Sequence, residues 1–211
     1  MINAIEALAR LRDGNRRFVA GQTETATLSN SARREALVAG QEPFAIILGC
    51  SDSRVPAELV FDQSFGDLFV IRVAGNIVAP SQVGSVEFAA SRFGTRLVVV
   101  MGHTQCGAIT ATLEELQGRA TSQSRNLRSI VDRVRPSVQT VLNGRRDVPL
   151  DALIRDAVRA NVRASVNHLR HGSELLERLI PEIGLLVVGA EYSLETGVVD
   201  FFENVPEFGP S

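Results

Sequence analysis

Four short, continuous runs of apolar residues constrain the fold of this chain more than any other feature. They span residues 44–48, 68–71, 97–101 and 185–188 and are rich in Val, Ile and Leu. Strands that are apolar at every position are buried on both faces, as in a parallel sheet covered by helices. Helical patterns lie between the runs, so the sequence predicts a three-layer α/β domain with helices on both faces. Residues 197–202 are expected to add an edge strand.

The predicted helices end at residues that favour helix termination. Residues 2–19 place apolar side chains at helical spacing before Gly21, which predicts an N-terminal helical arm. We expect a single domain, made of this arm, residues 1–40, and an α/β part, residues 41–211. Pro136 interrupts one helical pattern and predicts two helices or a kink there. The other helical patterns cover residues 31–38, 82–93, 104–116, 126–142, 153–172 and 173–180.

The composition excludes several classes of function. All 22 basic side chains are Arg, so the chain has neither the GK[ST] motif of P-loop proteins nor a Schiff-base lysine. A formal net charge of −2 argues against a nucleic-acid or membrane-surface binder. The sequence shows no apolar run near 18 residues and no secretory signal, and its two cysteines cannot form a disulfide framework. We therefore expect a soluble cytoplasmic protein without a nucleic-acid or membrane partner.

Two polar segments directly follow predicted strands and carry the candidate chemistry. Residues 49–54 read Gly-Cys-Ser-Asp-Ser-Arg after the first strand, and residues 102–107 read Gly-His-Thr-Gln-Cys-Gly after the third. In open parallel sheets, ligands bind beyond the carboxyl ends of the strands, where the strand order reverses. If these two strands are neighbours, Cys50, His103 and Cys106 converge at that edge.

Two thiolates and one imidazole form a ligand set that zinc favours. The His-x-x-Cys spacing also places two donors at the start of a helix, where backbone N–H groups stabilise a thiolate. Three protein ligands leave the fourth position of zinc to water, whose pKa falls from ~15.7 towards ~7 and which then supplies a hydroxide nucleophile. From the residues alone, Cys50, His103 and Cys106 can also be ordinary buried side chains, or the cysteines a redox pair.

Asp52 and Arg54 stand in the same loop as Cys50. One interpretation is an ordinary surface ion pair, which contributes little. The functional interpretation is that Arg54 holds Asp52 by two parallel hydrogen bonds, and that Asp52 accepts a hydrogen bond from the zinc-bound hydroxide. This would aim a lone pair of the hydroxide oxygen at the substrate.

Residues 50–54 and 102–107 resemble the two signature motifs of the bacterial-type β-class carbonic anhydrases. The similarity extends over roughly residues 8–202 and includes residues 67–76 (DLFVIRVAGN), 84–88 (GSVEF) and 161–162 (NV). The resemblance implies reversible hydration of carbon dioxide to bicarbonate and a proton, with one zinc ion per chain.

The resemblance also implies a homodimer or homotetramer with active sites at the subunit interface. Gln41 matches a glutamine that hydrogen-bonds the substrate oxygen from across that interface. The backbone N–H of Gly107 is implied as a donor to bicarbonate, and Phe69, Ala74 and Phe88 stand at positions of apolar pocket residues. The N-terminal helix would reach over the partner, although its apolar face can equally pack on its own domain.

An inhibitory bicarbonate site found in another branch of the family is incomplete here. That site uses a Trp, an Arg and a Tyr, and the corresponding residues are Ile47, Arg72 and Tyr192. Because the chain has no Trp, the inhibitory site is in doubt, and we assign Arg72 and Tyr192 structural roles. No proton shuttle is identified, since nothing places His168 or His171 near the zinc.

Two other functions are compatible with these residues. Zinc-bound hydroxide attacks any linear heterocumulene, so the same scaffold can serve a hydrolase of carbon disulfide or carbonyl sulfide. The chain can also be an inactive interaction module stabilised by zinc. Asp52 and Arg54 argue against the module, because a purely structural zinc site needs neither.

Overall fold

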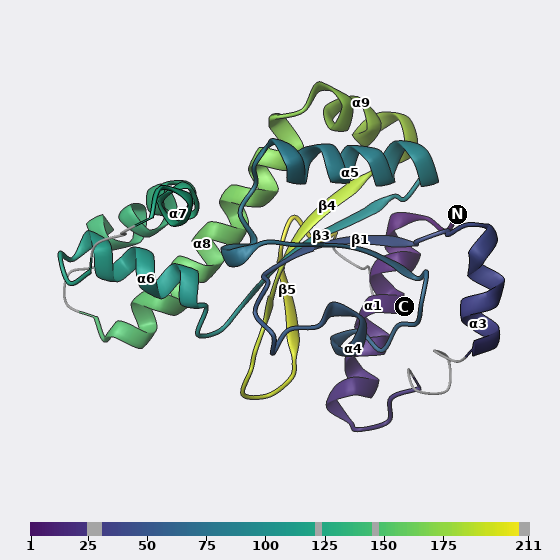
Figure 1. Ribbon diagram of the computed structural model, residues 1–211, viewed down its shortest axis with the longest axis horizontal. Coiled ribbons are helices and arrows are strands. Elements are labelled where there is room, and N and C mark those ends of the chain that lie inside the picture. Colours follow the sequence, from purple (N-terminus) through teal and green to yellow (C-terminus); the bar gives the residue numbers. More distant parts are fainter. Residues whose placement is uncertain (25–30, 121–123, 145–147, 207–211) are drawn as a thin grey trace.

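A five-stranded sheet forms the centre of the computed structural model, which describes residues 1–24, 31–120, 124–144 and 148–206 (Figure 1). The strand order is β2-β1-β3-β4-β5. Strands β1 to β4 are parallel, and β5 pairs antiparallel with β4 at the edge. This confirms the predicted α/β sheet with an added edge strand. The strands are β1 (Ala45–Gly49), β2 (Leu68–Arg72), β3 (Leu97–His103), β4 (Leu186–Tyr192) and β5 (Val199–Glu203).

The continuous apolar runs form strands because both faces of the sheet are covered. Every residue of β1 and of β3 is buried. Successive side chains of a strand point to opposite faces. Ile47 accordingly packs into one apolar cluster, whereas Ile46 and Leu48 pack into another on the opposite face. The central strands therefore need apolar residues at every position.

Helices α1 (Ala4–Val19) and α4 (Ala57–Val60) cover one face of the sheet (Figure 1). Leu8 and Leu11 of α1 are fully buried in the same apolar cluster as Ile47. Burying two leucine side chains stabilises the fold by about 3–6 kcal/mol. The N-terminal helix thus packs on its own domain, which is one of the two arrangements open from the sequence.

Three helices cover the opposite face: α5 (Pro80–Phe93), α8 (Leu150–His171) and α9 (Glu174–Ile183). Helix α8 lies close to the sheet because Gly102 of β3 and Gly189 of β4 have no side chain beneath it. A Cβ atom at Gly102 would lie 2.8 Å from Cγ2 of Val162, and one at Gly189 would lie 2.7 Å from its Cγ1. Contacts this short would displace either α8 or the strand ends that carry the site.

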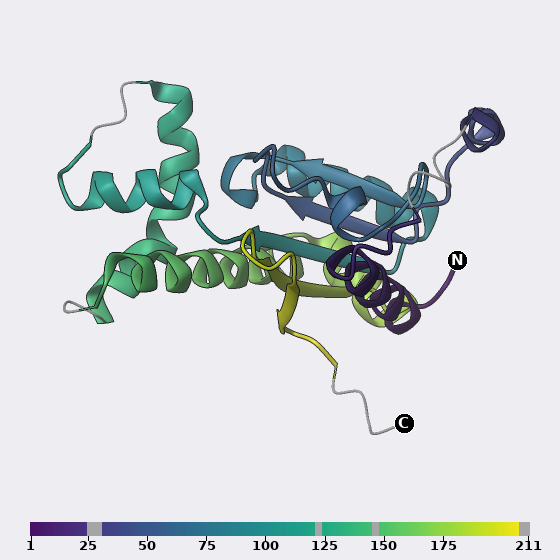
Figure 2. The same cartoon turned by 90° about the horizontal axis from the view of Figure 1, so that it is seen from below.

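Helices α6 (Gly107–Leu116) and α7 (Arg125–Gly144) extend beyond the carboxyl ends of the strands, beside the first half of α8 (Figure 2). Helix α7 continues through Pro136 as one helix, so of the two predicted alternatives, two helices or a kink, the two helices are wrong. Proline has no N–H, so the carbonyl group one turn earlier in the helix lacks its usual partner. Because Pro136 is exposed, water can bond this carbonyl group instead. Val134 and Val138 are fully buried against α6 and α8 and hold the helix on both sides of the proline.

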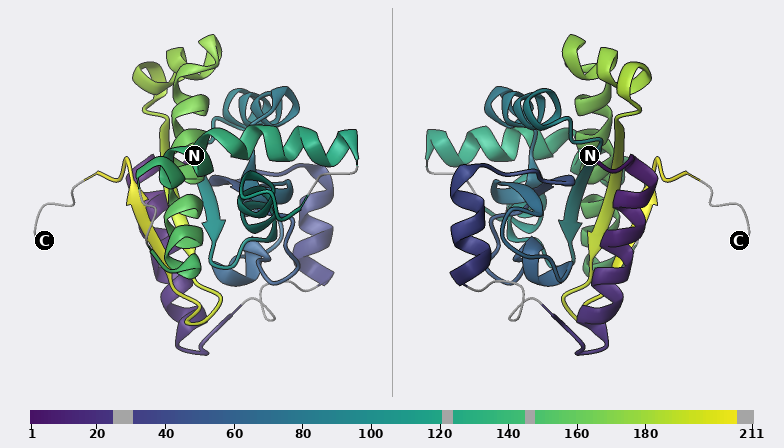
Figure 3. Two further views of the ribbon diagram at one scale, coloured as in Figure 1. Left: turned by 90° about the vertical axis from the view of Figure 1, so that its left-hand side faces the viewer. Right: turned by 90° about the vertical axis from the view of Figure 1, so that its right-hand side faces the viewer.

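Helix α3 (Ser31–Ala36) and the 3₁₀ turn η1 (Leu37–Ala39) stand apart from α1, beside the segment that leads into β2 (Figure 3). None of the α3 residues is buried. Arg33 ties the helix to the domain, because its Nε donates to the backbone oxygen of Phe65 at 3.2 Å and its guanidinium lies 3.3 Å from the Asp67 carboxylate.

Several predicted boundaries differ from the structure. Helix α9 runs through Pro181 to Ile183, although it was predicted to stop before the proline. Helix α6 begins at Gly107 instead of residue 104, because β3 extends to His103 and the next residues form a turn. No helix in the described parts of the chain is long and apolar enough to cross a membrane.

Candidate active site

Three side chains that can bind a metal meet at the carboxyl ends of neighbouring strands. Cys50 follows β1 directly, His103 is the last residue of β3, and Cys106 immediately precedes α6. Strands β1 and β3 are neighbours, and the strand order reverses between them. The two sulfur atoms and a ring nitrogen all lie within 4.8 Å of one another, and all three residues are buried. The structure therefore brings together the three residues singled out in the sequence.

The chemistry of this group fits a metal ion. Nδ1 of His103 bonds the backbone oxygen of Thr104 at 2.8 Å, which places the proton on Nδ1 and leaves the lone pair of Nε2 free. Nε2 is buried and has no hydrogen-bond partner among the described residues. A buried polar atom without a partner costs free energy, which a bound ligand would recover. The two sulfur atoms and Nε2 can therefore hold a metal ion.

The two cysteines influence each other's protonation. The neighbouring Cys106 thiol, as a hydrogen-bond donor, lowers the pKa of Cys50 to about 4, although burial opposes this shift. The same contact and burial raise the pKa of Cys106. Burial by itself lowers the pKa of His103, but the Cys50 sulfur, the Thr104 backbone oxygen and the Asp52 charge together outweigh it, so the pKa of His103 is raised. Without a metal, the pair holds one thiolate, and a cation would stabilise the second.

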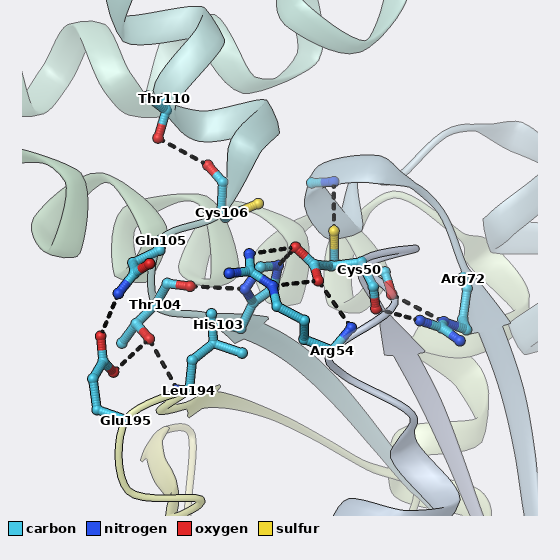
Figure 4. A network of polar contacts seen from close by, with 12 residues as sticks. Cys50, Arg54, Arg72, His103, Thr104, Gln105, Cys106, Thr110, Leu194 and Glu195 are labelled. Carbon is cyan, nitrogen blue, oxygen red and sulfur yellow. Dashed lines mark hydrogen bonds and ion pairs between the residues drawn. The ribbon is translucent and has the colours of Figure 1, made fainter.

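Arg54 holds the Asp52 carboxylate by two parallel hydrogen bonds, as the sequence predicts (Figure 4). Nε donates to Oδ1 at 2.9 Å, and the terminal nitrogen donates to Oδ2 at 2.8 Å. These bonds hold the pKa of Asp52 well below its usual range. Oδ2 also lies 3.8 Å from Nε2 of His103. An ionised carboxylate therefore stands beside the three metal-binding atoms.

Arg72 supports the loop that carries Cys50 and Asp52. Its Nε donates to the backbone oxygen of Cys50 at 3.0 Å, and its terminal nitrogen donates to that of Asp52 at 2.6 Å (Figure 4). Ile47 and Tyr192 are buried in the apolar cluster beneath α1. Arg72 thus bonds a loop backbone, and Ile47 and Tyr192 pack in the core, which agrees with the structural roles expected for Arg72 and Tyr192.

Two of the predicted substrate-binding residues lie beside the metal-binding group. Gly107 is exposed and is the first residue of α6, so its N–H group has no partner within the helix. Ala74 opens the 3₁₀ turn η2 (Ala74–Asn76), whose Gly75 N–H donates to the Cys50 sulfur at 3.3 Å. Gly107 therefore directly follows a residue of the group, and Ala74 directly precedes a residue that bonds one.

The other three predicted substrate-binding residues lie elsewhere in the same chain. Gln41 is exposed and precedes β1, whose five residues separate it from Cys50 by roughly 16 Å. Phe69 pairs in register with Ile46, near the amino end of β1. Phe88 is 54% exposed on α5, and its ring centroid lies 6.2 Å from that of Phe69. A single chain therefore does not bring these side chains to the metal-binding group.

Sequence reasoning missed Glu195, in the turn between β4 and β5. Its carboxylate accepts hydrogen bonds from Thr104 and Gln105, the two residues between His103 and Cys106. The Thr104 hydroxyl contributes most to lowering the pKa of Glu195 to about 2. No spacing or motif in the sequence relates Glu195 to residues 90 positions away.

The fold and the site define an α/β protein with a buried Cys-His-Cys group that can hold a metal ion. Known proteins are similar to this chain over most of its length. The sequence model of the carbonic anhydrase family matches residues 45–199. Carbonic anhydrase 2 of Mycobacterium tuberculosis is 37% identical over 207 residues, which cover 98% of this chain and 97% of that protein.

Solved structures show the same relationship. A β-carbonic anhydrase of Aspergillus fumigatus superposes with a TM-score of 0.74 at 25% identity and covers 82% of both chains. A structure of tetrameric β-carbonic anhydrases from Sordaria macrospora matches with a TM-score of 0.70 at 25% identity, over 82% of this chain and 86% of that one. The chain therefore belongs to the β-class carbonic anhydrase family, enzymes that hydrate carbon dioxide, as its two motifs predict.

Proposed function

We propose that this enzyme hydrates carbon dioxide reversibly to bicarbonate and a proton, with one zinc ion per chain held by Cys50, His103 and Cys106. The observation that carries the proposal is the buried Cys-His-Cys group, whose ligand atoms all lie within 4.8 Å of one another. Two thiolates and an imidazole favour zinc over harder cations such as magnesium and calcium. Among the residues that the structure describes, the group offers three protein ligands, which is typical of a catalytic site.

Zinc bound there would lower the pKa of a coordinated water from ~15.7 to ~7, the value established for the three-histidine site of other carbonic anhydrases, and so supply a hydroxide nucleophile. Asp52 would accept a hydrogen bond from this nucleophile and so orient it. The carboxylate can do so because Arg54 keeps it ionised and in place. In this proposal Arg54 acts through Asp52, because both of its side-chain hydrogen bonds go to that carboxylate.

Gly107 is proposed to bind the product. The first N–H groups of a ten-residue helix have no partner inside it and favour an anion. The N–H of Gly107 can thus donate to an oxygen of bicarbonate, and Ala74 lines the apolar side of the same space. Donors at this place stabilise the negative charge that forms when hydroxide adds to carbon dioxide.

A second copy of the chain is proposed to complete the site with Gln41, Phe69 and Phe88. These side chains lie away from the metal-binding group of their own chain, and Phe88 is exposed. The β-carbonic anhydrases from Sordaria macrospora are tetrameric, which supports a homodimer or homotetramer here. Within the predicted arm, residues 1–40, helix α1 packs on its own domain, so the exposed helix α3 would be the part that reaches the partner. We place the enzyme in the cytoplasm.

Comparative turnover of three gases tests the proposed function. The purified protein should contain one zinc per chain and should hydrate carbon dioxide with a kcat/KM of about 10⁴ M⁻¹s⁻¹ or more. Turnover of carbonyl sulfide and carbon disulfide, measured in parallel, should be far slower. Faster turnover of either sulfur compound would assign the chain to the hydrolases, and a zinc-loaded protein inactive on all three would be an interaction module.

Gln41→Ala tests the contribution of the second copy. If Gln41 donates a hydrogen bond to substrate across the interface, its loss should lower kcat/KM by about 5- to 150-fold, which corresponds to ~1–3 kcal/mol. Zinc content and oligomeric state should not change, because Gln41 contacts neither the metal-binding group nor the core. The neighbouring exposed residue provides a control, Glu42→Ala, which should keep the parental kcat/KM. Parental activity in Gln41→Ala would show that Gln41 is an ordinary exposed loop residue and does not bind the substrate.

A further inference from the structure

A carboxylate from the turn between β4 and β5 faces the two residues that separate His103 from Cys106. Oε2 of Glu195 accepts a hydrogen bond from the Thr104 hydroxyl at 2.8 Å, and Oε1 accepts one from the Gln105 amide at 2.7 Å (Figure 4). The bond from Gln105 is short for an N–H···O hydrogen bond, as expected for a charged acceptor.

Thr104 links this carboxylate to the imidazole of His103. The Thr104 hydroxyl accepts a hydrogen bond from the backbone N–H of Leu194 at 3.0 Å, while it donates to Glu195. The backbone N–H of Thr104 donates to the Tyr192 oxygen at 3.0 Å, and its own oxygen bonds Nδ1 of His103 at 2.8 Å. The orientation of the imidazole ring therefore depends on the position of Thr104.

Gln105 links the same carboxylate to Cys106. Its backbone has a φ of +56°, in the left-handed region that residues other than glycine seldom adopt. This conformation forms the sharp turn after which Cys106 points back toward His103 and Cys50. The bond from the Gln105 side chain to Glu195 helps to hold the strained backbone in place.

We propose that Glu195 is a positioning residue, which holds the Thr104–Gln105 turn and thereby fixes the placement of His103 and Cys106 around a bound metal ion. The proposal rests on the proposed function, because it requires that these two residues bind the metal. Partners that orient metal ligands typically change metal affinity by about 10- to 100-fold. Glu195 acts through one intervening residue on each side, so we expect an effect near the lower limit.

The test measures metal release from the zinc-loaded enzyme. Glu195→Ala should lose zinc to an excess of chelator about 10-fold faster than the parent. In the cobalt-substituted protein, its visible absorption bands should shift because the ligand geometry changes. Glu195→Asp, which keeps the charge, should restore part of the parental rate, whereas Glu195→Gln, which keeps the size, should restore less.

Ser193→Ala is the matched control. The Ser193 hydroxyl donates to Oε2 of Glu195 at 3.1 Å and accepts from the Thr196 N–H, but no hydrogen bond joins it to Thr104 or Gln105. This variant should release zinc at the parental rate. Thermal unfolding of the metal-free variants shows whether any of them is simply less stable, and Glu195→Gln provides the comparison if Glu195→Ala does not fold.

Three outcomes would overturn the proposal. The first is release of zinc from Glu195→Ala at the parental rate with an unchanged cobalt spectrum. The second is equally fast release from Ser193→Ala, which would mean that Glu195 only stabilises the β4–β5 turn. The third is absence of zinc from the parent protein, which would overturn the proposed function as well and is distinguished by metal analysis before any variant is compared.

Discussion

Replacement of Cys106 by Ser is expected to remove most of the zinc and nearly all carbon dioxide hydration. A serine hydroxyl is a far poorer zinc ligand than a thiolate. Cys50 and His103 alone would leave two ligands, too few for the catalytic geometry. Activity should therefore fall by more than the roughly 10- to 100-fold seen when a residue that only touches a ligand is changed.

Metal analysis of the purified variant, together with kcat/KM for carbon dioxide, measures this effect. Thr110→Val is the matched control on the same helix, because the Thr110 hydroxyl donates to the backbone oxygen of Cys106 at 3.2 Å and is not a ligand. The control should keep one zinc per chain. A fully zinc-loaded Cys106→Ser would show that the assignment of this ligand is wrong.

Asp52→Asn is expected to keep its zinc and to lose about 10²-fold or more of its activity, the usual contribution of a group that accepts a proton or its hydrogen bond. The amide has one oxygen and one NH₂ group, so it cannot accept the two parallel hydrogen bonds that Arg54 donates to the two carboxylate oxygens. Its NH₂ group would also donate to the nucleophile instead of accepting. Ser53→Ala, next in the loop and exposed, should retain parental activity. Near-parental turnover of zinc-loaded Asp52→Asn would contradict the orienting role.

The pH dependence of the parent provides an independent check on Asp52. Arg54 holds the pKa of this carboxyl below its unperturbed value near ~3.9. The ion pair therefore stabilises the folded enzyme above that pH, and this stabilisation is lost only as the pH falls below it. Asp52 stays ionised between pH 6 and 9, where kcat/KM should rise as a single-proton curve with a midpoint around ~7.

A steep loss of activity involving several protons below pH 8 would contradict this expectation. It would mean that Asp52 leaves Arg54 and takes the fourth zinc position cooperatively. The inhibitory site that another family branch uses for such control has Ile47 here in place of its Trp, and Arg72 already bonds the backbone oxygens of Cys50 and Asp52. We therefore expect the paired state of Asp52 and Arg54 to dominate at neutral pH.

The sequence by itself determined the sheet and the local part of the site. The central strands are buried on both faces and therefore need apolar residues at every position. A continuous apolar run in the sequence is thus enough to predict such a strand. The Asp52–Arg54 pair was predictable because a single residue separates its members, so their contact needs no distant element. The His103–Cys106 spacing is local in the same way.

The tertiary structure alone decided which distant elements complete and support that site. The position of α1, the continuation of α7 through Pro136 and of α9 through Pro181 all depend on burial against other elements, which outweighs local preference. Glu195 meets Thr104 and Gln105 only because β4 lies beside β3 and the following turn returns to the same edge. Such contacts join residues about 90 positions apart. They depend on the packing of the whole sheet, so no short sequence pattern can predict them.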